Sequence, residues 1–314
     1  MSTDTPQDNA ASAPRWERLH AHQAEVGGLP IRRALPTARR RMVGAWCFLD
    51  HAGPASLPEG RQMRVGPHPH TGLQTFSWLI DGEILHRDSL GSEQWLRPGQ
   101  VNLMSAGRGI SHSEEARAGA IQLAQLWIAL PEAHRFDPPA FSHHPELPRL
   151  TCGDWQGTLL VGDWAGQRSP VPVHTPLLGL DLACDAAAQG RAALRADFEY
   201  GLMVLEGELA LDLDGEPLGS AQPGELIYLA PGAQDLTLDA RAPARALLLG
   251  GPPFPEPVLL WWNFVGRSGE EIQRYAAEWN AREDGGIFGQ VRGYDGPRLP
   301  APDASALRLR TPGA

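Results

Sequence analysis

The sequence is poor in features that mark several large classes of protein. Its 314 residues contain three cysteines, Cys47, Cys152 and Cys184, which are odd in number and widely spaced. This spacing predicts reduced thiols instead of a disulfide framework. No apolar run approaches the roughly 18 residues that a membrane span needs, and the polar first residues show neither the basic nor the apolar region of a signal peptide. We therefore expect a cytoplasmic protein that does not contact membranes.

Basic residues are also in the minority. The chain carries 27 Lys and Arg against 37 Asp and Glu, which gives a formal net charge of −10 at pH 7. Tight, nonspecific nucleic-acid binding depends on neutralising phosphates, so this balance argues against direct contact with nucleic acid. A local arginine cluster is predicted to be a solvated surface, with an anion or an acidic partner as the alternative. Its members are Arg32, Arg33, Arg39, Arg40 and Arg41.

What the sequence does contain is a stretch, residues 64–115, with two short histidine motifs. His68 and His70 form H-x-H, and His112 and Glu114 form H-x-E. On a β-strand, side chains two residues apart point to the same face of the sheet. If the motifs lie on neighbouring strands, three imidazoles and one carboxylate converge. The spacing therefore predicts a metal site, with four polar residues that bind no metal as the alternative.

The residues between the two motifs favour strands. Asp81-Gly82 is a turn signal between the strand-like runs 76–80 and 83–86, which together indicate a hairpin. The rest of the stretch alternates turn residues with short apolar runs and shows no helical periodicity. This pattern is typical of a β-barrel.

The second half of the sequence repeats the turns of the first half at a fixed distance of 125 residues. The repeated pairs are Gly82 with Gly207, Pro98-Gly99 with Pro223-Gly224, and Gly107 with Gly232. Fixed spacing of turn residues indicates an internal duplication of one barrel.

The same offset shows what the second half has lost. It takes the four ligand-type residues to Ala193, Arg195, Thr237 and Asp239. This set cannot form a comparable site, although the alignment around the first pair could slip by a residue or two. We therefore expect one metal ion per chain and a second barrel that is structural or serves as an interaction surface.

The chain resembles the pirin family in the segments GPHPHTGLQT, DGEILHRDSLGS and PGQVNLMSAGRGISHSE, and the likeness extends from about Leu29 to the tail. The resemblance implies an all-β protein of two tandem cupin (jelly-roll) barrels with a short C-terminal helix. We expect a disordered N-terminus at 1–14 and a first barrel with the metal site at 15–150. The second barrel, at 151–314, is expected to include the helix and a wrapping tail.

Local patterns place the helix and the linker of this arrangement. Ser268 and Glu271 form a capping box, and apolar residues follow at helical spacing, which predicts a helix at about 269–282. Five prolines between Pro131 and Pro148 predict an irregular connector. A solvated loop and a lid over the metal site are the two interpretations of this connector.

In pirins, residues of the two histidine motifs bind a single metal ion, usually iron. The resemblance therefore assigns His68, His70, His112 and Glu114 as the ligands of one divalent ion, with Fe(II) as the first choice. Ligand chemistry alone leaves Fe, Cu, Ni, Mn and Zn open, and a zinc ion held for stability is a further alternative. Most pirins have Glu where this chain has Gln74, so a supporting role for that position beside the ligands is in question.

The resemblance implies two classes of function. Pirins resemble quercetin 2,3-dioxygenases, which implies an oxidoreductase that cleaves a flavonol such as quercetin with O₂. Glu114 is then the candidate base. The alternative is an iron-dependent, redox-sensing regulator that acts through protein contacts, as a transcriptional co-regulator or a modulator of a metabolic enzyme. The acidic composition fits a protein partner better than DNA.

Overall fold

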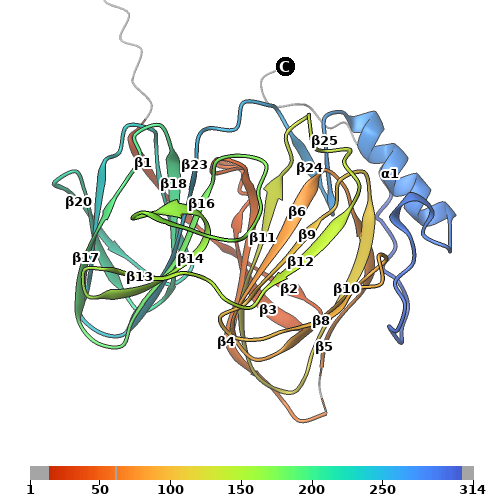
Figure 1. Ribbon diagram of the computed structural model, residues 1–314, viewed down its shortest axis with the longest axis horizontal. Coiled ribbons are helices and arrows are strands. Elements are labelled where there is room, and N and C mark those ends of the chain that lie inside the picture. Colours follow the sequence, from red (N-terminus) through yellow and green to blue (C-terminus); the bar gives the residue numbers. More distant parts are fainter. Residues whose placement is uncertain (1–13, 61, 306–314) are drawn as a thin grey trace, which may run out of the picture.

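The computed structural model of the chain describes residues 14–60 and 62–305. This part is almost entirely β-structure, arranged in two units that lie side by side, with one α-helix at the outer edge of the first unit (Figure 1). The expected disordered segment 1–14 lies outside the described residues, except for Pro14. No helix in the described ranges is long and apolar enough to cross a membrane.

The first unit consists of two antiparallel sheets. The larger sheet has the strand order β12-β9-β6-β11-β4-β3-β2, and the smaller has the order β5-β10-β7-β8. The strands of the larger sheet are β2 (His22–Val26), β3 (Leu29–Leu35), β4 (Trp46–Leu57), β6 (Leu73–Asp81), β9 (Val101–Ser105), β11 (Gly119–Ala129) and β12 (Ala140–His144). Those of the smaller sheet are β5 (Met63–His70), β7 (Ile84–Asp88), β8 (Glu93–Leu96) and β10 (Ile110–Ala116).

The second unit repeats this plan. Its larger sheet has the order β1-β21-β18-β23-β16-β14-β13, with β15 beside β14, and its smaller sheet has the order β17-β22-β19-β20. The strands of the larger sheet are β1 (Trp16–His20), β13 (Arg149–Cys152), β14 (Trp155–Trp164), β15 (Gln167–Arg168), β16 (Leu178–Cys184), β18 (Glu199–Glu206), β21 (Glu225–Leu229) and β23 (Ala244–Gly251). Those of the smaller sheet are β17 (Ala188–Ala193), β19 (Leu209–Leu213), β20 (Glu216–Ala221) and β22 (Asp235–Ala240).

Neither unit closes into a barrel within the described residues. In each unit the two sheets remain separate in their hydrogen bonding and pack face to face around an apolar core. The expected all-β class, the two tandem units and the short C-terminal helix are confirmed. The two sheets of each unit stay separate at their edges, because their outer strands do not pair with each other.

The burial pattern of the strands reflects these layers. β17 alternates buried and exposed residues over its whole length, as expected for a strand with one face in solvent. β6 is buried at seven consecutive positions, because its sheet is covered on both faces. The second covering layer is the larger sheet of the other unit: a shared core contains Trp46 and Phe76 from the first unit and Met203 and Leu247 from the second. The two units therefore share an extensive apolar interface.

The N-terminal strand belongs to the second unit. It was expected in the first barrel, but β1 pairs with β21, from Trp16 opposite Leu229 to His20 opposite Glu225. The expected boundary of 15–150 therefore does not describe the packing of this strand. The pairing partner lies about 200 residues away in sequence, and no local pattern indicates it.

The C-terminal segment makes the reverse crossing and packs on the first unit. β24 (Leu259–Trp261) and β25 (Phe264–Gly266) form a hairpin, and Phe264 bridges to Thr71 at the end of β5. Further along, the Leu299 N–H donates a hydrogen bond of 2.8 Å to the Pro67 carbonyl. The described part of the tail, which ends at residue 305, thus contacts the first unit, whereas the sequence placed the tail with the second.

The duplication predicted from the turn spacing is visible in the structure. The pairing order β9-β6-β11-β4 of the first unit recurs as β21-β18-β23-β16 in the second. The repeated turn glycines share a left-handed backbone conformation, with φ of 91° at Gly82 and 74° at Gly207, and of 51° at Gly107 and 104° at Gly232. At Gly107 an added Cβ would lie 2.0 Å from the Asp137 carbonyl oxygen, so only glycine fits.

The predicted helix is present as α1 (Gly269–Ala281). The Ser268 side chain caps its first turn by accepting a hydrogen bond of 3.2 Å from the Glu271 N–H. The buried face contains Ile272, Tyr275 and Trp279, and it packs with β25 and the 3₁₀ turn η1 (Gly286–Phe288). Because β25 and η1 contact the smaller sheet of the first unit, the helix belongs to that unit in space.

The proline-rich connector is more regular than predicted. It contains β12, which pairs with β9, and leads into β13, which pairs with β14. The interpretation as an irregular loop was therefore wrong for residues 140–144. The prolines lie outside these strands, and β12 is an edge strand, where a neighbouring proline does not interrupt a ladder.

Candidate metal centre

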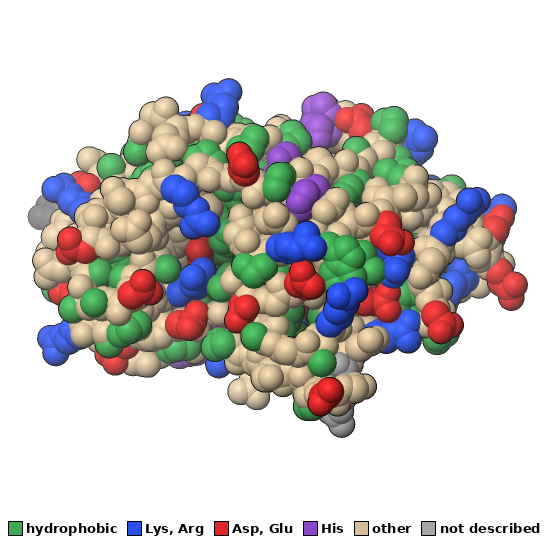
Figure 2. All heavy atoms as spheres, turned by 60° about the horizontal axis from the view of Figure 1, so that its bottom comes forward, with side chains coloured by type: hydrophobic (Ala, Val, Ile, Leu, Met, Phe, Trp, Pro, Cys, Tyr) green, Lys and Arg blue, Asp and Glu red, His purple; other side chains and the backbone are tan. Residues whose placement is uncertain are grey.

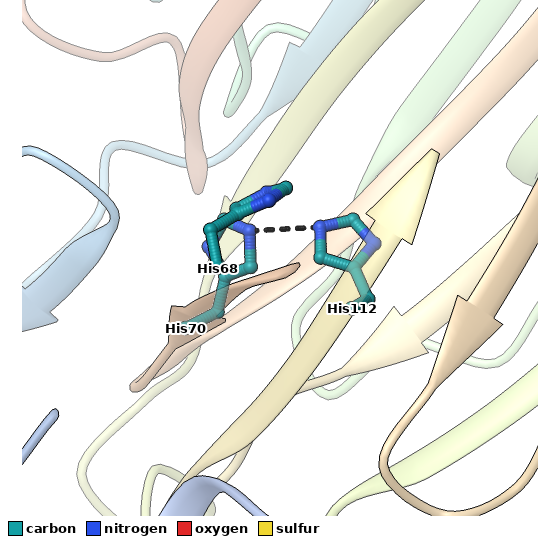
Figure 3. A group of neighbouring side chains, drawn as sticks. All are labelled: His68, His70 and His112. Atoms are coloured by element: carbon teal, nitrogen blue, oxygen red, sulfur yellow. Dashed lines mark hydrogen bonds between the residues drawn. The ribbon is translucent and has the colours of Figure 1, made fainter. Parts of the chain in front are cut away.

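Three histidine side chains converge inside the first unit, on the inner face of its smaller sheet. His68 and His70 lie on β5, and His112 lies on β10 directly opposite His68. The ring centroids of His68 and His112 are 4.3 Å apart, and those of His70 and His112 are 4.9 Å apart. Figure 3 shows His70 and His112 facing each other through their Nε2 atoms, which are 3.0 Å apart. The structure thus brings together the three imidazoles that the sequence singled out.

Backbone carbonyls hold two of these rings from outside. His68 Nδ1 lies 2.8 Å from the Gly66 carbonyl oxygen, and His70 Nδ1 lies 3.1 Å from the Asn263 carbonyl oxygen. A carbonyl oxygen only accepts hydrogen bonds, so each ring donates its N–H from Nδ1 and keeps a lone pair on Nε2. Both Nε2 atoms are therefore available as ligands.

His86 and Asp88 hold the third ring in the same way. They lie on β7, opposite Glu114 and His112 of β10. His86 Nε2 lies 3.1 Å from Asp88 Oδ2, and its Nδ1 lies 3.4 Å from His112 Nδ1. With Asp88 accepting from His86 Nε2–H, Nδ1 of His86 can accept the proton that His112 Nδ1 supplies to their contact. His112 Nε2 then carries a lone pair as well.

The pKa of Asp88 agrees with its role as a hydrogen-bond acceptor. Burial raises the pKa of Asp88, but hydrogen bonds from His86 and Ser92 outweigh burial and bring this pKa below its ordinary value of 3.8. Asp88 is thus an ionised acceptor inside the protein. The His86 ring also stacks on Phe141, with centroids 4.5 Å apart and 13° between the planes, which fixes its orientation.

Burial keeps the three converging rings neutral. It lowers the pKa of His68 to about 4 and the pKa values of His70 and His112 well below 6.5, and the neighbouring rings act in the same direction. Metal ligation requires deprotonated nitrogen, so these rings are ready to bind at neutral pH.

The facing lone pairs fit a bound cation. Two ligands at right angles on an ion with bonds of about 2.1 Å lie about 3 Å apart. The Nε2 atoms of His70 and His112 are 3.0 Å apart. Imidazole suits divalent iron, copper, nickel and zinc. The donor set therefore fits one transition-metal ion.

Glu114, the fourth predicted ligand, lies beside His112 but is displaced from the other two histidines. A β-bulge interrupts the register after His112, so that Glu114 pairs with Val65. Its carboxylate forms a group with His86 and His112, whose ligand-type atoms lie within 4.8 Å of one another. The side chain is half-buried and faces a cavity, and burial raises its pKa above 4.5 against the opposing effects of His86 and Ser77.

Gln74 is buried on β6 and is not among the residues that line this cavity. Its Nε2 donates a hydrogen bond of 2.8 Å to Ser105 Oγ. The structure thus places Gln74 in the interior of the sheet, and its supporting role beside the ligands stays a prediction.

The histidines form one wall of a cavity of about 720 Å³. On another wall, Phe48 of β4 and Trp127 of β11 stack with centroids 4.0 Å apart and 13° between their planes. The Trp127 ring also meets His70 edge-on, at 5.1 Å between centroids. Small-molecule sites typically have volumes of about 300–1,000 Å³ and apolar walls. The cavity therefore suits a flat aromatic molecule next to the histidines.

The hairpin β24–β25 covers the same cavity from the C-terminal end of the chain. Leu260, Trp262 and Asn263 line it. Trp262 has a φ of 50°, in the left-handed region that non-glycine residues seldom adopt. Because Asn263 also holds His70, the hairpin both encloses the cavity and orients a ligand.

Sequence reasoning missed His86, Asp88 and Asn263. The first two form an H-x-D pair, with the same two-residue spacing as the motifs on β5 and β10. That spacing was a usable signal for a third strand of the site. Asn263 left no signal, because it acts through its backbone carbonyl on a residue 193 positions away.

The second unit has no counterpart of the three histidines. Thr237 takes the place of His112 in the repeat, and Arg191 lies opposite Thr237 as His68 lies opposite His112. The 125-residue offset therefore slips by two residues in β17, which puts Arg191 and Ala193 at the first two ligand positions. Neither residue supplies an imidazole.

Charge on the surface is mixed in sign. Figure 2 shows acidic and basic side chains interspersed over the face in view. Within the arginine cluster, Arg33 forms an ion pair of 2.6 Å with Asp50, and Arg40 lies 3.3 Å from Glu17. These two carboxylates thus neutralise part of the positive charge of the cluster.

Comparison with known proteins agrees with this architecture. The family model described as Pirin matches residues 28–128, and the one described as Pirin C-terminal cupin domain matches residues 179–285. A Pseudomonas aeruginosa protein provisionally named quercetin 2,3-dioxygenase is 50% identical over 289 residues, which cover 91% of this chain and 90% of the relative. A Caulobacter vibrioides pirin-like protein is 36% identical over 272 residues, which cover 83% of this chain and 91% of the relative.

A solved structure supports the fold along almost the full chain. The crystal structure titled as quercetin 2,3-dioxygenase from Acinetobacter baumannii superposes with a TM-score of 0.88 at 43% sequence identity, and the match covers 94% of this chain and 97% of that one. With both family models matched in chain order, the chain belongs to the pirin family, and its two units are cupin domains.

Proposed function

We propose that this protein is a metal-dependent dioxygenase that cleaves a flavonol-type substrate such as quercetin with O₂. The observation that carries the proposal is the convergence of the Nε2 lone pairs of His68, His70 and His112 on an aromatic-walled cavity of about 720 Å³. The names of the Pseudomonas aeruginosa relative and of the Acinetobacter baumannii structure support the same activity.

We assign His68, His70, His112 and Glu114 to one divalent ion, with Fe(II) as the first choice and Cu, Ni, Mn or Zn as alternatives. Three imidazoles and one carboxylate suit these ions better than Ca²⁺ or Mg²⁺. A bound ion of this kind acidifies a coordinated hydroxyl group and positions two reactants next to each other. A purely structural zinc site is less well supported, because structural sites are closed and the histidines here face a cavity.

The protein side chains have separate tasks in this proposal. The stacked Phe48 and Trp127 provide a flat apolar wall against which an aromatic ring can lie. Glu114 faces the cavity, and its carboxylate can remove a substrate hydroxyl proton when its bond to the metal is weak or shifts. Trp262 and Leu260 enclose the cavity and limit the entry of water.

Oxygen consumption tests the proposal directly. Metal-free protein is loaded with Fe(II) without air and then mixed with quercetin in air-saturated buffer, and loss of flavonol absorbance is followed together with oxygen uptake. We expect the two signals to run in parallel in the wild type. His70→Ala should show no turnover above free Fe(II), whereas Thr237→Ala, at the equivalent place in the second unit, should match the wild type. Iron-loaded wild type that consumes no oxygen above free iron would overturn the proposal and favour the regulatory alternative.

We also infer a cytoplasmic location. All three cysteines are buried as free thiols, and burial raises the pKa of Cys47 to about 12, which keeps that thiol unreactive. Reduced thiols are typical of cytoplasmic proteins. Cell fractionation with an antibody against the chain tests this, and recovery from an extracytoplasmic fraction would contradict it.

A further inference from the structure

A second group of ligand-type side chains lies outside the cupin cavity, where the two units meet. It consists of His134 and Asp137 from the connector and His174 from the loop between β15 and β16. One ligand-type atom of each residue lies within 4.8 Å of the other two. The rings of His134 and His174 are 4.2 Å apart between centroids and inclined by 32°. Two imidazoles and one carboxylate, drawn from both units, therefore meet at one surface point.

The backbone sets the positions of His134 and Asp137 in a tight turn. The N–H groups of His134 and Arg135 both donate to the Pro131 carbonyl, at 2.9 and 3.0 Å, and the Asp137 N–H donates to the His134 carbonyl at 3.1 Å. His134 Nδ1 lies 2.7 Å from Asp137 Oδ2, so the two side chains share one side of the turn. The Asp137 carbonyl accepts from the Arg108 N–H at 3.1 Å, which anchors the turn on the first unit.

The charge next to this turn does not oppose a cation. Arg135 is the basic residue within the turn, and its guanidinium forms ion pairs with Glu132 and Glu271. Its positive charge is therefore balanced by two carboxylates.

His174 is held from the second unit by a preformed loop, residues 169–177. Ser169 anchors the start of the loop, since its N–H donates to the Gly162 carbonyl at 2.9 Å and its Oγ donates to the Leu160 carbonyl at 2.8 Å. Leu177, at the other end, is buried in the core shared by the two units. Prolines within the loop restrict its backbone further. His174 itself is exposed.

We propose that His134, Asp137 and His174 form a second metal site, which takes a divalent transition ion such as Zn²⁺ and links the two units. Two imidazoles and one carboxylate are borderline ligands that suit Zn²⁺ better than Ca²⁺ or Mg²⁺. Ligands of a tetrahedral zinc ion with bonds of about 2.1 Å lie about 3.4 Å apart. Side-chain rotations that move the ligand atoms by about 1 Å close the present group around such an ion. The exposure of the site lets water complete the coordination shell.

Binding at this site restrains one wall of a second cavity. The second unit contains a cavity of about 990 Å³, lined by the continuous run 168–178 together with Ala193 and Arg195. His174 is part of that run. An ion that joins His174 to the turn of the first unit therefore fixes this wall relative to the first unit.

A zinc titration tests the site independently of the proposed dioxygenase activity. The full chain is stripped of metal and titrated with ZnCl₂ in competition with a chromogenic chelator, in a His70→Ala background that disables the cupin site. We expect one zinc equivalent in His70→Ala and an affinity at least tenfold weaker in His70→Ala/His174→Asn. The matched control is His70→Ala/His20→Asn, which removes an exposed histidine outside both groups and should keep the zinc equivalent.

Amide hydrogen exchange supplies a second measurement, which separates zinc binding at this site from a general change in the stability of the variant. Zinc should slow amide exchange in residues 169–177 of His70→Ala and leave the same amides unchanged in His70→Ala/His174→Asn. Equal zinc affinity in these two proteins, or zinc-induced protection of the loop in both or in neither, would overturn the proposal.

Discussion

The Nδ1 atom of His86 lies 3.4 Å from the Nδ1 atom of His112, whereas the other ring nitrogen of His112, Nε2, faces His70. Through this contact, a residue outside the predicted ligand set controls which nitrogen of His112 carries the proton. Asp88 extends the chain of contacts, because it holds the other nitrogen of His86 at 3.1 Å. Partners of this kind orient metal-binding histidines and raise their basicity.

His86→Phe should therefore lower metal affinity while preserving packing. The phenyl ring can keep the stacking on Phe141 but cannot accept the His112 Nδ1–H. Loss of such a partner typically costs about 10- to 100-fold in metal affinity, and we expect an effect of this size in a competition titration. His86→Gln, whose side-chain oxygen can accept the proton, should recover part of the loss. Wild-type affinity in His86→Phe would contradict the assigned role of His86.

Removing a ligand should affect only the first cupin unit. His70→Ala takes away one of the two facing Nε2 atoms, and we expect elemental analysis to find no metal at the cupin site of this variant. Thr237→Ala, at the equivalent strand position of the second unit, should retain the wild-type metal content. A metal that binds only the folded state raises the melting temperature. Added metal should therefore raise the melting temperature of Thr237→Ala, and binding at the cupin site should not raise that of His70→Ala. Equal metal content in the two variants would refute the assignment.

Period-2 spacing allowed part of the histidine cluster of the candidate site to be predicted from sequence. His68 and His70 share a face because they are two residues apart on one strand, which local spacing is sufficient to show, whereas His112 joins them through the pairing of β10 with β5. The helix was equally local, since Ser268 caps Glu271 within one turn. The position of Glu114 could not be predicted, because the β-bulge that displaces it depends on the partner strand and not on the motif.

The packing of the N-terminal strand on the second unit and of the C-terminal segment on the first could not be predicted from local sequence patterns, for a different reason. Trp16 pairs with Leu229 and Phe264 pairs with Thr71 across about 200 residues of sequence, and neither short segment carries a local pattern that identifies its partner. Non-local pairing of this kind is set by the assembled surface, and sequence periodicity does not describe it.

His51 should make stability depend on pH. It is fully buried, and burial together with nearby Arg32 and Arg245 lowers its pKa from 6.5 to about 3. A depressed pKa means that the folded state binds fewer protons than the unfolded state between these values. The stability from the neutral ring is therefore complete above pH 6.5 and is lost as the pH falls toward 3.

Between pH 7 and pH 4 the His51 contribution should decrease by about 3 kcal/mol. Urea unfolding of metal-free wild type and His51→Gln across this range measures it. The Gln side chain can still accept the hydrogen bond from Gln122 but does not titrate. The cupin-site histidines are present in both proteins, so the difference between the two pH profiles isolates His51. Parallel profiles would show that His51 is not responsible.

Glu114→Gln tests whether this carboxylate acts as the base of the proposed reaction. Its neighbour Glu115 offers a matched control: Glu115 faces the other way, pairs with Arg64 at 3.1 Å and with Arg87, and does not line the metal cavity. Glutamine keeps the shape of the side chain and an oxygen that can coordinate a metal, but it cannot accept a proton at neutral pH. General-base catalysis contributes about 10²- to 10⁴-fold to rate, so Glu114→Gln should lose at least about 100-fold in turnover per bound metal ion. Glu115→Gln should stay close to the wild type.

Rates are divided by the metal content of each preparation, because Glu114→Gln also weakens a proposed ligand. If Glu114→Gln turns over quercetin as fast as Glu115→Gln at equal metal content, the proton leaves by another route and Glu114 is not the base.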